Sequence, residues 1–215
     1  ENGGDRVGLT TGLTVGPLTG TTGIGATITH QGHAQFAGVC TATSFSGSGS
    51  GLTGLSAGLT MADQWRVSTS QSTSAHTVAD ITAWSRNNNH FAGVGGALTN
   101  SGANFTFPST GIYYVSYNIA TYITSGSARY ISARLYFRGQ DICHSWASAH
   151  HGASSGQTLQ STGSQAIIDV TNTATQTFKI RLQSSVPVTI VGLNEAGYNS
   201  SVNMSEVVVM RLGDT

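Results

Sequence analysis

The residues best suited to do chemistry lie in one short segment. His144, Trp146, His150 and His151 fall within eight positions of the chain. This cluster could bind a metal ion through imidazole nitrogens, or present an aromatic ring to a sugar. We expect it at the end of a strand and in the following loop, where binding residues usually lie. The plainer alternative is that Trp146 packs into the core and the histidines are solvated.

A second pair of histidines, His30 and His33, lies in a stretch rich in Gly and Thr. In a trimeric fibre, three copies of one histidine can hold a metal ion on the axis. Residues three apart on a strand face opposite ways, so only one of the two could be axial, unless the turn at Gly32 changes this parity. We expect both histidines to be structural or solvated, and no metal or other cofactor is predicted.

The sequence offers no pattern for catalysis. Enzymes that cleave glycans need two carboxylates at a suitable separation. The acidic residues beyond position 60 stand apart from one another: Asp63, Asp80, Asp141, Asp169, Glu195, Glu206 and Asp214. We expect each of them in a turn or on the surface. The motifs G-x-S-x-G, H-E-x-x-H and the phosphate-binding loop are absent, so we expect that the protein is not an enzyme.

The composition limits the kinds of partner. Only 8% of the residues are charged, and nine basic and nine acidic groups give a net charge of zero. Nucleic acids and anionic membranes are bound by clustered Lys and Arg, so both are excluded as general partners. No apolar run approaches the ~18 residues of a membrane span. We expect Cys40 and Cys143 to be unpaired, largely buried thiols.

The strand pattern is clearest in residues 105–119, FTFPSTGIYYVSYNI. A Pro-Ser-Thr-Gly turn separates two strand-like runs. In the second run, alternation places four side chains on one face: Tyr113, Val115, Tyr117 and Ile119. Such alternation predicts a strand with two different faces. We expect this face either in the core or at a trimer interface, and an error of one residue in register would exchange the two faces.

The composition changes near residue 60 and suggests two parts. Residues 1–60 hold 15 of the 28 glycines and too few large side chains for a core of their own. They predict a Gly/Thr-rich β-stem with strands at 26–30, 34–36 and 39–45. Each chain has too few apolar anchors for a sheet, so three chains wound together would close the strand edges. The alternative is a disordered linker.

Residues 61–215 predict one compact all-β domain, in which short strands and polar turns favour a sandwich or barrel. Strands are expected at 64–68, 105–107, 112–123, 130–138, 141–145, 165–170, 177–183, 188–191 and 202–212. Residues 68–89 form a polar stretch that includes Ile81 and Trp84. Together with residues 144–157, it is where we expect ligand-binding loops.

Three of these segments resemble a known family. Residues 105–119, the hairpin at 135–139 and the last strand resemble the complement-type globular head, one of the tumour-necrosis-factor-like jelly rolls. The most specific part is Gly111-Ile112-Tyr113. The start at residues 61–66, MADQWR, looks like the head domains of bacteriophage fibre proteins. Residues 38–55 are similar to stem repeats of such fibres.

The resemblance implies a homotrimer with a β-stem followed by a jelly-roll head, in which the last strand returns through the middle of the sandwich. It implies a non-enzymatic virion fibre protein, exposed on the particle and joined to other virion proteins through its N-terminal segment. The head would bind a host surface glycan or protein. Alternatives are a capsid decoration or short head-fibre protein, and a bacterial extracellular adhesin or filament subunit. A depolymerase ranks last.

Overall fold

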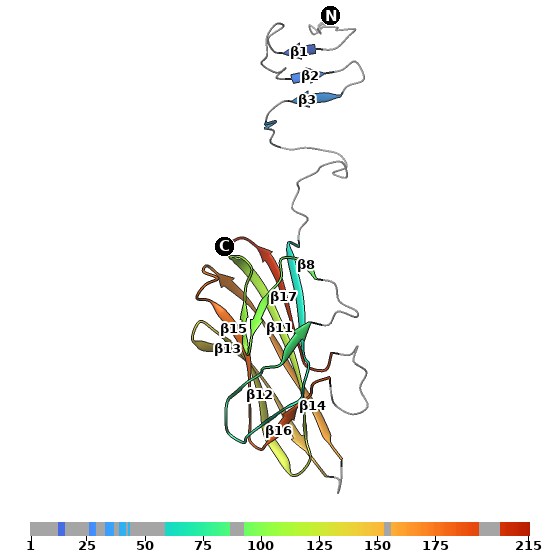
Figure 1. The fold of residues 1–215 in the computed structure, drawn as a ribbon, viewed down its shortest axis with the longest axis vertical. Coiled ribbons are helices and arrows are strands. Elements are labelled where there is room, and N and C mark those ends of the chain that lie inside the picture. Colours follow the sequence, from blue (N-terminus) through green and yellow to red (C-terminus); the bar gives the residue numbers. More distant parts are fainter. Residues whose placement is uncertain are drawn as a thin grey trace, which may run out of the picture. The chain divides into compact units, whose positions relative to one another are not determined.

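The computed structural model describes residues 13–15, 26–28, 33–36, 39–41, 43, 59–86, 93–152, 156–193 and 203–215. The chain divides into two compact units, Glu1–Gly54 and Leu55–Thr215, and we call the second unit the head. Every regular element in the described ranges is a β-strand (Figure 1), which confirms the expected all-β class.

The N-terminal unit contains a small antiparallel sheet. Its order is β1 (Leu13–Val15), β2 (Ala26–Ile28) and β3 (Ala34–Phe36). We did not predict β1, and β2 covers the described part of the strand expected at 26–30. The expectation that three chains are needed to form a sheet here is wrong for these strands, because they pair within one chain.

The rest of the N-terminal unit departs from expectation in two places. No strand forms at the described residues 39–41 and 43. Cys40 is exposed, so the expectation of a buried thiol is wrong there, although it is unpaired as expected. His33 is exposed, and His30 lies outside the described residues.

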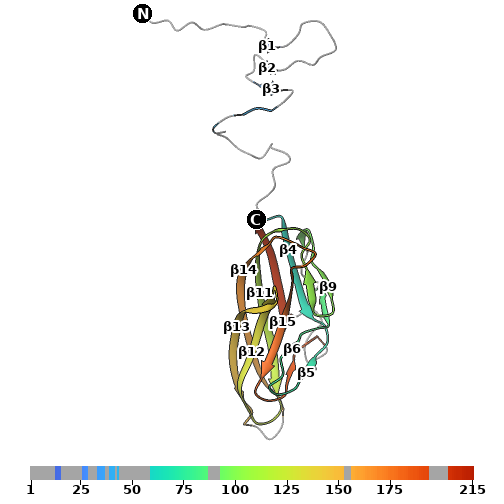
Figure 2. The ribbon, with the colours of Figure 1, turned by 90° about the vertical axis from the view of Figure 1, so that its left-hand side faces the viewer.

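Two sheets build the head, and their strands run side by side along its length (Figure 2). In the described residues, the first has six strands in the order β13-β12-β15-β10-β9, with β6 beside β15. Its strands are β6 (Ala79–Asp80), β9 (Thr99–Ser101), β10 (Asn104–Thr106), β12 (Ser127–Phe137), β13 (Gln140–His150) and β15 (Thr177–Ser184).

The second sheet has eight strands within the described ranges, in the order β5-β16-β11-β17-β4-β7, with β14 beside β11 and β8 beside β4. They are β4 (Met61–Val67), β5 (Gln71–Thr73), β7 (Trp84–Arg86), β8 (Val94–Gly95), β11 (Gly111–Ile123), β14 (Thr158–Val170), β16 (Val188–Ile190) and β17 (Glu206–Gly213). The last strand, β17, lies between β11 and β4, which confirms that it returns through the middle of the sandwich.

The core lies between the two sheets. Tyr113, Val115, Tyr117 and Ile119 are at most 2% exposed, so the structure places this face of β11 inside one chain. The aromatic rings of Phe107 and Tyr113 lie 4.6 Å apart between centroids. Alternation along β11 therefore leaves the other face of this strand on the outside of the sandwich.

The segment that we predicted as a polar connection, residues 68–89, also contributes to the core as far as it is described. It forms β5, β6 and β7, and it buries Ile81 and Trp84 at 0% and 7% exposure. The indole Nε1 of Trp84 donates to the Ile81 carbonyl over 2.9 Å. These anchors hold the segment against the sandwich.

Asp63 is the acidic residue that departs most from expectation, because it is only 1% exposed. Its carboxylate accepts hydrogen bonds from the indole of Trp65, at 3.1 Å, and from the backbone N–H of Leu98, at 2.9 Å. Arg86 adds two more bonds, at 3.1 and 2.9 Å. The carboxylate is thus paired and hydrogen-bonded, as a buried charge must be, and it ties three segments together.

Candidate functional site: an aromatic row on the six-stranded sheet

Trp146 lies on the outside of the head, 61% exposed. The alternative that it packs into the core is therefore wrong. It belongs to β13, not to a loop, so the expectation that residues 144–150 form part of a binding loop is also wrong. Alternation places His144, Trp146, Ser148 and His150 on the outer face, while Ala149 faces inward and is buried.

Four aromatic rings form a continuous line on this face, which we call the aromatic row: His76, Tyr130, Trp146 and His144. The rings of His76 and Tyr130 lie 6.2 Å apart between centroids. Tyr130 and Trp146 meet edge to face at 5.7 Å, and Trp146 and His144 stack at 6.1 Å. Three separate segments supply these rings, so the row exists only in the folded head.

His76 is fixed at one end of the row by its backbone and its ring. It has a φ of 58°, a left-handed conformation that is strained for a residue with a side chain. Its N–H donates to the Ser184 carbonyl over 2.7 Å, and its carbonyl accepts from Gln183. Its Nδ1 lies 3.1 Å from the Tyr130 hydroxyl. Strain that the surroundings hold in place is common in ligand-binding segments.

A network of ion pairs continues the same face. The carboxylate of Asp141 pairs with Arg134 at 3.1 Å and with Arg181 at 3.4 Å. Asp80 pairs with Lys179 at 2.6 Å and with Arg181 at 3.2 Å. Arg134 also donates to Ser132 and Gln183 and lies opposite His144 across the β12–β13 pair. Three cations thus share two carboxylates beside the aromatic row.

The two sheets differ in charge within the described residues. The six-stranded sheet and its β12–β13 turn carry five cations and two acids: Arg129, Arg134, Arg138, Lys179, Arg181, Asp80 and Asp141. The eight-stranded sheet carries three of each: Arg66, Arg86, Arg211, Asp63, Asp169 and Glu206. The strands of the six-stranded sheet therefore have a net charge of +2, which Arg138 in the turn raises to +3, and the strands of the eight-stranded sheet have none.

The two remaining histidines of the predicted cluster lie apart from the row. His150 ends β13, where its Nδ1 is 2.5 Å from the Ser127 hydroxyl. His151 is buried at 9% exposure, with its Nδ1 3.0 Å from the Thr158 hydroxyl. The structure therefore brings His144 and Trp146 together and leaves His150 and His151 at the end of the sheet.

In the ranges that the structure describes, no group of three or more His, Cys, Asp or Glu side chains is arranged to hold a metal ion. Cys143 is an unpaired thiol that is half-buried. Among the described residues there is no helix long and apolar enough to span a membrane.

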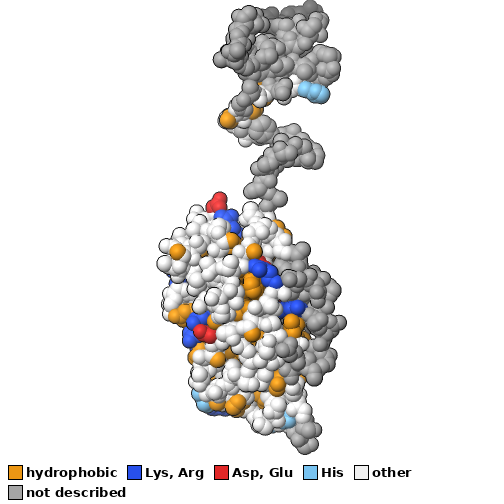
Figure 3. All heavy atoms as spheres, in the orientation of Figure 1, with side chains coloured by type: hydrophobic (Ala, Val, Ile, Leu, Met, Phe, Trp, Pro, Cys, Tyr) orange, Lys and Arg blue, Asp and Glu red, His pale blue; other side chains and the backbone are white. Residues whose placement is uncertain are grey.

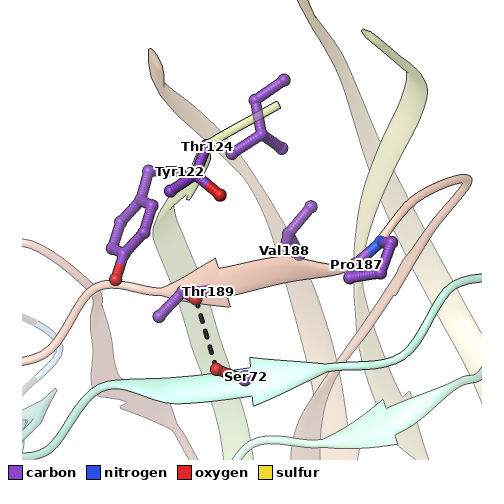
Figure 4. A pocket seen from close by; sticks show the side chains of 7 residues that line it. Ser72, Tyr122, Thr124, Pro187, Val188 and Thr189 are labelled. Carbon is purple, nitrogen blue, oxygen red and sulfur yellow. Dashed lines mark hydrogen bonds between the residues drawn. The ribbon is translucent and has the colours of Figure 1, made fainter. Parts of the chain in front are cut away.

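A pocket and a groove of the head lie outside the aromatic row. A pocket of about 110 Å³ is lined by Ser72, Tyr122, Ile123, Thr124, Pro187, Val188 and Thr189. Figure 4 shows its hydroxyl groups, of which those of Ser72 and Thr189 lie 3.3 Å apart. A groove of about 580 Å³ is lined by Phe137, Arg138, Gln140, Ile142, Ala166, Ile167, Ile168 and Asp169. Neither includes the aromatic row, which is an open surface.

Sequence reasoning missed His76, Tyr130, Arg134 and Asp141 as parts of the site. Alternation along residues 140–150 could have placed His144 and Trp146 on one face. It could not have placed Tyr130 beside them, because the pairing of β12 with β13 is irregular between Ala128 and Ile131. Few charged side chains mark the surface; Figure 3 shows one face, where they are scattered among neutral groups.

Comparisons with known proteins bear on the fold of the head. No protein-family model and no curated protein sequence matches the chain. Among solved structures, the Eiger TNF from S. frugiperda is similar, with a TM-score of 0.50 and 16% identity, over 73% of this chain and 95% of that one.

Two further solved structures are more distant. Murine APRIL has a TM-score of 0.48 and 11% identity, over 71% of this chain and 98% of that one. The PRD1 vertex protein P5 has a TM-score of 0.41 and 15% identity, over 73% of this chain and 100% of that one. The similarity to Eiger, together with the two-sheet topology, shows that the head is a TNF-like jelly-roll sandwich.

Proposed function

We propose that the protein is a homotrimeric structural fibre protein of a bacteriophage virion, whose exposed head binds a component of the host surface. The observation that carries this proposal is the contrast between the two outer faces of the head. One face carries a line of apolar side chains, and the other carries the aromatic row and its ion pairs. The phage assignment itself rests on the resemblance of residues 38–55 and 61–66 to phage fibres.

The outer face of the eight-stranded sheet supports self-association. Its register places five apolar side chains in one line across five strands: Ile167, Tyr114, Met210, Ala62 and Val94. Ile167 is 68% exposed and Val94 is 43% exposed; Tyr114 and Met210 are half-buried, and Ala62 is 9% exposed. Extended apolar surface of this kind marks interaction sites. A second copy of the chain is the expected cover, because the TNF-like resemblance implies a homotrimer.

The N-terminal unit also supports self-association. Each of its strands has three residues, and a sheet this small is marginal in water on its own. Phe36 is 48% exposed and Val39 is 93% exposed. Association of three chains would cover these side chains. We further propose that this unit attaches the head to other virion proteins.

The outer face of the six-stranded sheet is then free to bind a component of the host surface. Its aromatic row, with Trp146 exposed at its centre, lies on a different sheet from the apolar line. Three copies in one trimer would present three rows. Multiple weak contacts of this kind give a high overall avidity.

Sedimentation equilibrium of the full chain tests the assembly. We expect a trimer, and we expect Ile167→Glu to shift it towards the monomer, because a charge in an apolar contact is costly. Ser148→Glu is the matched control, since it adds the same charge at an exposed position of the other sheet. A monomeric wild-type chain would contradict the proposal.

Labelling virions with an antibody to the head tests the location. We expect label on the tail fibres. We also expect virions that lack the protein to lose adsorption to the host. Label on the capsid would favour a decoration or short head-fibre protein instead. Label on bacterial cells alone would favour an adhesin or filament subunit.

A further inference from the structure

We propose that the aromatic row binds an acidic saccharide, with a sugar ring against Trp146 and its carboxylate or phosphate facing the cations of the six-stranded sheet. This inference rests on the recognition role proposed for the head and names its ligand class.

The ring geometry favours a flat, polar ligand with one apolar side. Trp146 offers the largest exposed aromatic surface in the described residues of the row, at 61% exposure, and Tyr130 meets it at an interplanar angle of 71°. Aromatic faces are electron-rich, so they attract the slightly positive C–H groups on one side of a pyranose ring. Hydroxyls on the sugar's edge would then meet polar side chains, of which the half-buried Gln183 lies on β15 in the same register as Trp146.

The charge of the sheet favours an anion on that saccharide. Arg134, Lys179 and Arg181 share only two carboxylates, so this network has one positive charge in excess. Arg134 lies opposite His144, and therefore next to the end of the aromatic row. A ligand carboxylate or phosphate would balance the charge, and electrostatic complementarity of this kind also speeds association.

Other ligand classes fit less well. Single-stranded nucleic acid needs a strongly basic groove that follows its backbone, whereas the ion-pair network beside the row has only one positive charge in excess, which suits a single anionic group. An apolar peptide needs a hydrophobic pocket, and neither described hollow includes the row. A cationic ligand would be repelled by the net charge of +3 on this sheet and its β12–β13 turn.

The side chains of the aromatic row are also held in place before a ligand binds. Tyr130 and His144 hold Trp146 from two sides, and the backbone contacts of His76 fix the position of Tyr130 through the hydrogen bond between their side chains. A side chain that is already ordered loses less conformational entropy when a ligand binds. An exposed tryptophan held in this way is typical of the residues that dominate binding energy.

The test uses a panel of immobilised glycans that carry carboxylates, phosphates or no charge. The full chain is applied to the panel, and its affinity for the glycan that it binds best is then measured by titration. Wild-type protein is compared with Trp146→Ala and Arg134→Gln. Leu159→Ala is the control for loss of an exposed apolar side chain, and Asp169→Asn is the control for a unit change of charge. Both controls lie on β14 of the other sheet.

We expect binding to acidic glycans that weakens at least about tenfold in Trp146→Ala, the size of effect seen at tryptophan hot spots. Arg134→Gln should weaken binding and reduce its salt dependence, because a charge is removed from the site. The controls should bind like wild type. Carboxylated and phosphorylated glycans in the panel distinguish the two kinds of anion.

Three results would overturn the inference: binding to neutral glycans alone, binding to no glycan, or binding that is unchanged in Trp146→Ala. Circular dichroism shows whether each variant is folded. The test needs neither virions nor trimers. If the protein is absent from virions but binds acidic glycans through Trp146, the proposed location fails and the ligand class stands.

Discussion

The indole ring of Trp146 meets the phenol ring of Tyr130 edge to face, with centroids 5.7 Å apart. Both residues lie on neighbouring strands of one sheet, β12 and β13. The Tyr130 hydroxyl in turn lies 3.1 Å from the Nδ1 of His76. This contact holds a large ring in one place while leaving most of its surface exposed.

Exposed and buried tryptophans should respond differently to truncation. Trp146→Ala is expected to change the free energy of unfolding by no more than about 0.5 kcal/mol, as is usual for surface positions. Trp84→Ala should cost about 3–5 kcal/mol, because Trp84 is 7% exposed and packs on Phe105. Urea unfolding at one fixed protein concentration measures both. Equal losses in the two variants would mean that Trp146 is part of the core.

The buried carboxylate of Asp63 should be essential for stability. Asp63→Asn keeps the shape but points an amide N–H₂ at N–H donors and leaves Arg86 without its partner. We expect a loss of about 1–3 kcal/mol, the cost of leaving a buried hydrogen-bond donor without its acceptor. Asp169→Asn is the matched control on the exposed side of β14 and should change stability by about 0.5 kcal/mol or less. A loss below about 1 kcal/mol for Asp63→Asn would contradict the buried network.

The close approach of β14 to β11 at Gly163 leaves no room for a side chain. A Cβ there would lie 2.4 Å from the Tyr117 carbonyl oxygen and 3.1 Å from the Cα of Asn118. We expect Gly163→Ala to destabilise the head by about 1–3 kcal/mol, as overpacking does. Gly213→Ala is the control, because nothing lies within 4 Å of its Cβ position. Thermal unfolding of both variants checks this, and equal midpoints would show that the strands can separate locally.

Alkaline pH should destabilise the head through Tyr117. Burial raises the pKa of its hydroxyl, which donates to the Ala133 carbonyl over 3.0 Å. The unfolded tyrosine has a pKa of about 10. Because the folded pKa is raised, this contribution to stability is complete below pH 10 and is lost as the pH rises towards the folded value. The slope is about 1.4 kcal/mol per pH unit for one proton.

Tyr117→Phe isolates that effect. The variant should lose the part of the alkaline slope that comes from Tyr117, and it should be about 0.5–1.5 kcal/mol less stable at neutral pH, because one hydrogen bond is missing. The Ala133 carbonyl keeps a second donor, the Ser145 hydroxyl at 3.3 Å. Denaturant titrations at neutral pH and above pH 10 make the comparison. Parallel pH profiles for wild type and variant would rule out Tyr117 as the cause.

Local patterns in the sequence were enough to predict the class of fold and several of its strands. The alternation of Tyr113, Val115, Tyr117 and Ile119 marks a two-faced strand because successive side chains in a strand point to opposite sides. The low charge and the many Ser, Thr and Gly residues disfavour helices over strands and turns. These are local properties, so they can be read without knowing which segments meet.

The tertiary structure decided the features that depend on partners distant in the sequence. Asp63 could be buried only because Arg86 and Leu98 bring donors to it. Trp146 is a surface residue because β13 turns its other face, with Ala149, towards the core, and Tyr130 joins it through an irregular pairing of β12 with β13. Face, register and the meeting of charges across strands are set by long-range packing. The sequence alone therefore determined the class of fold and several of its strands, and the folded head determined the site.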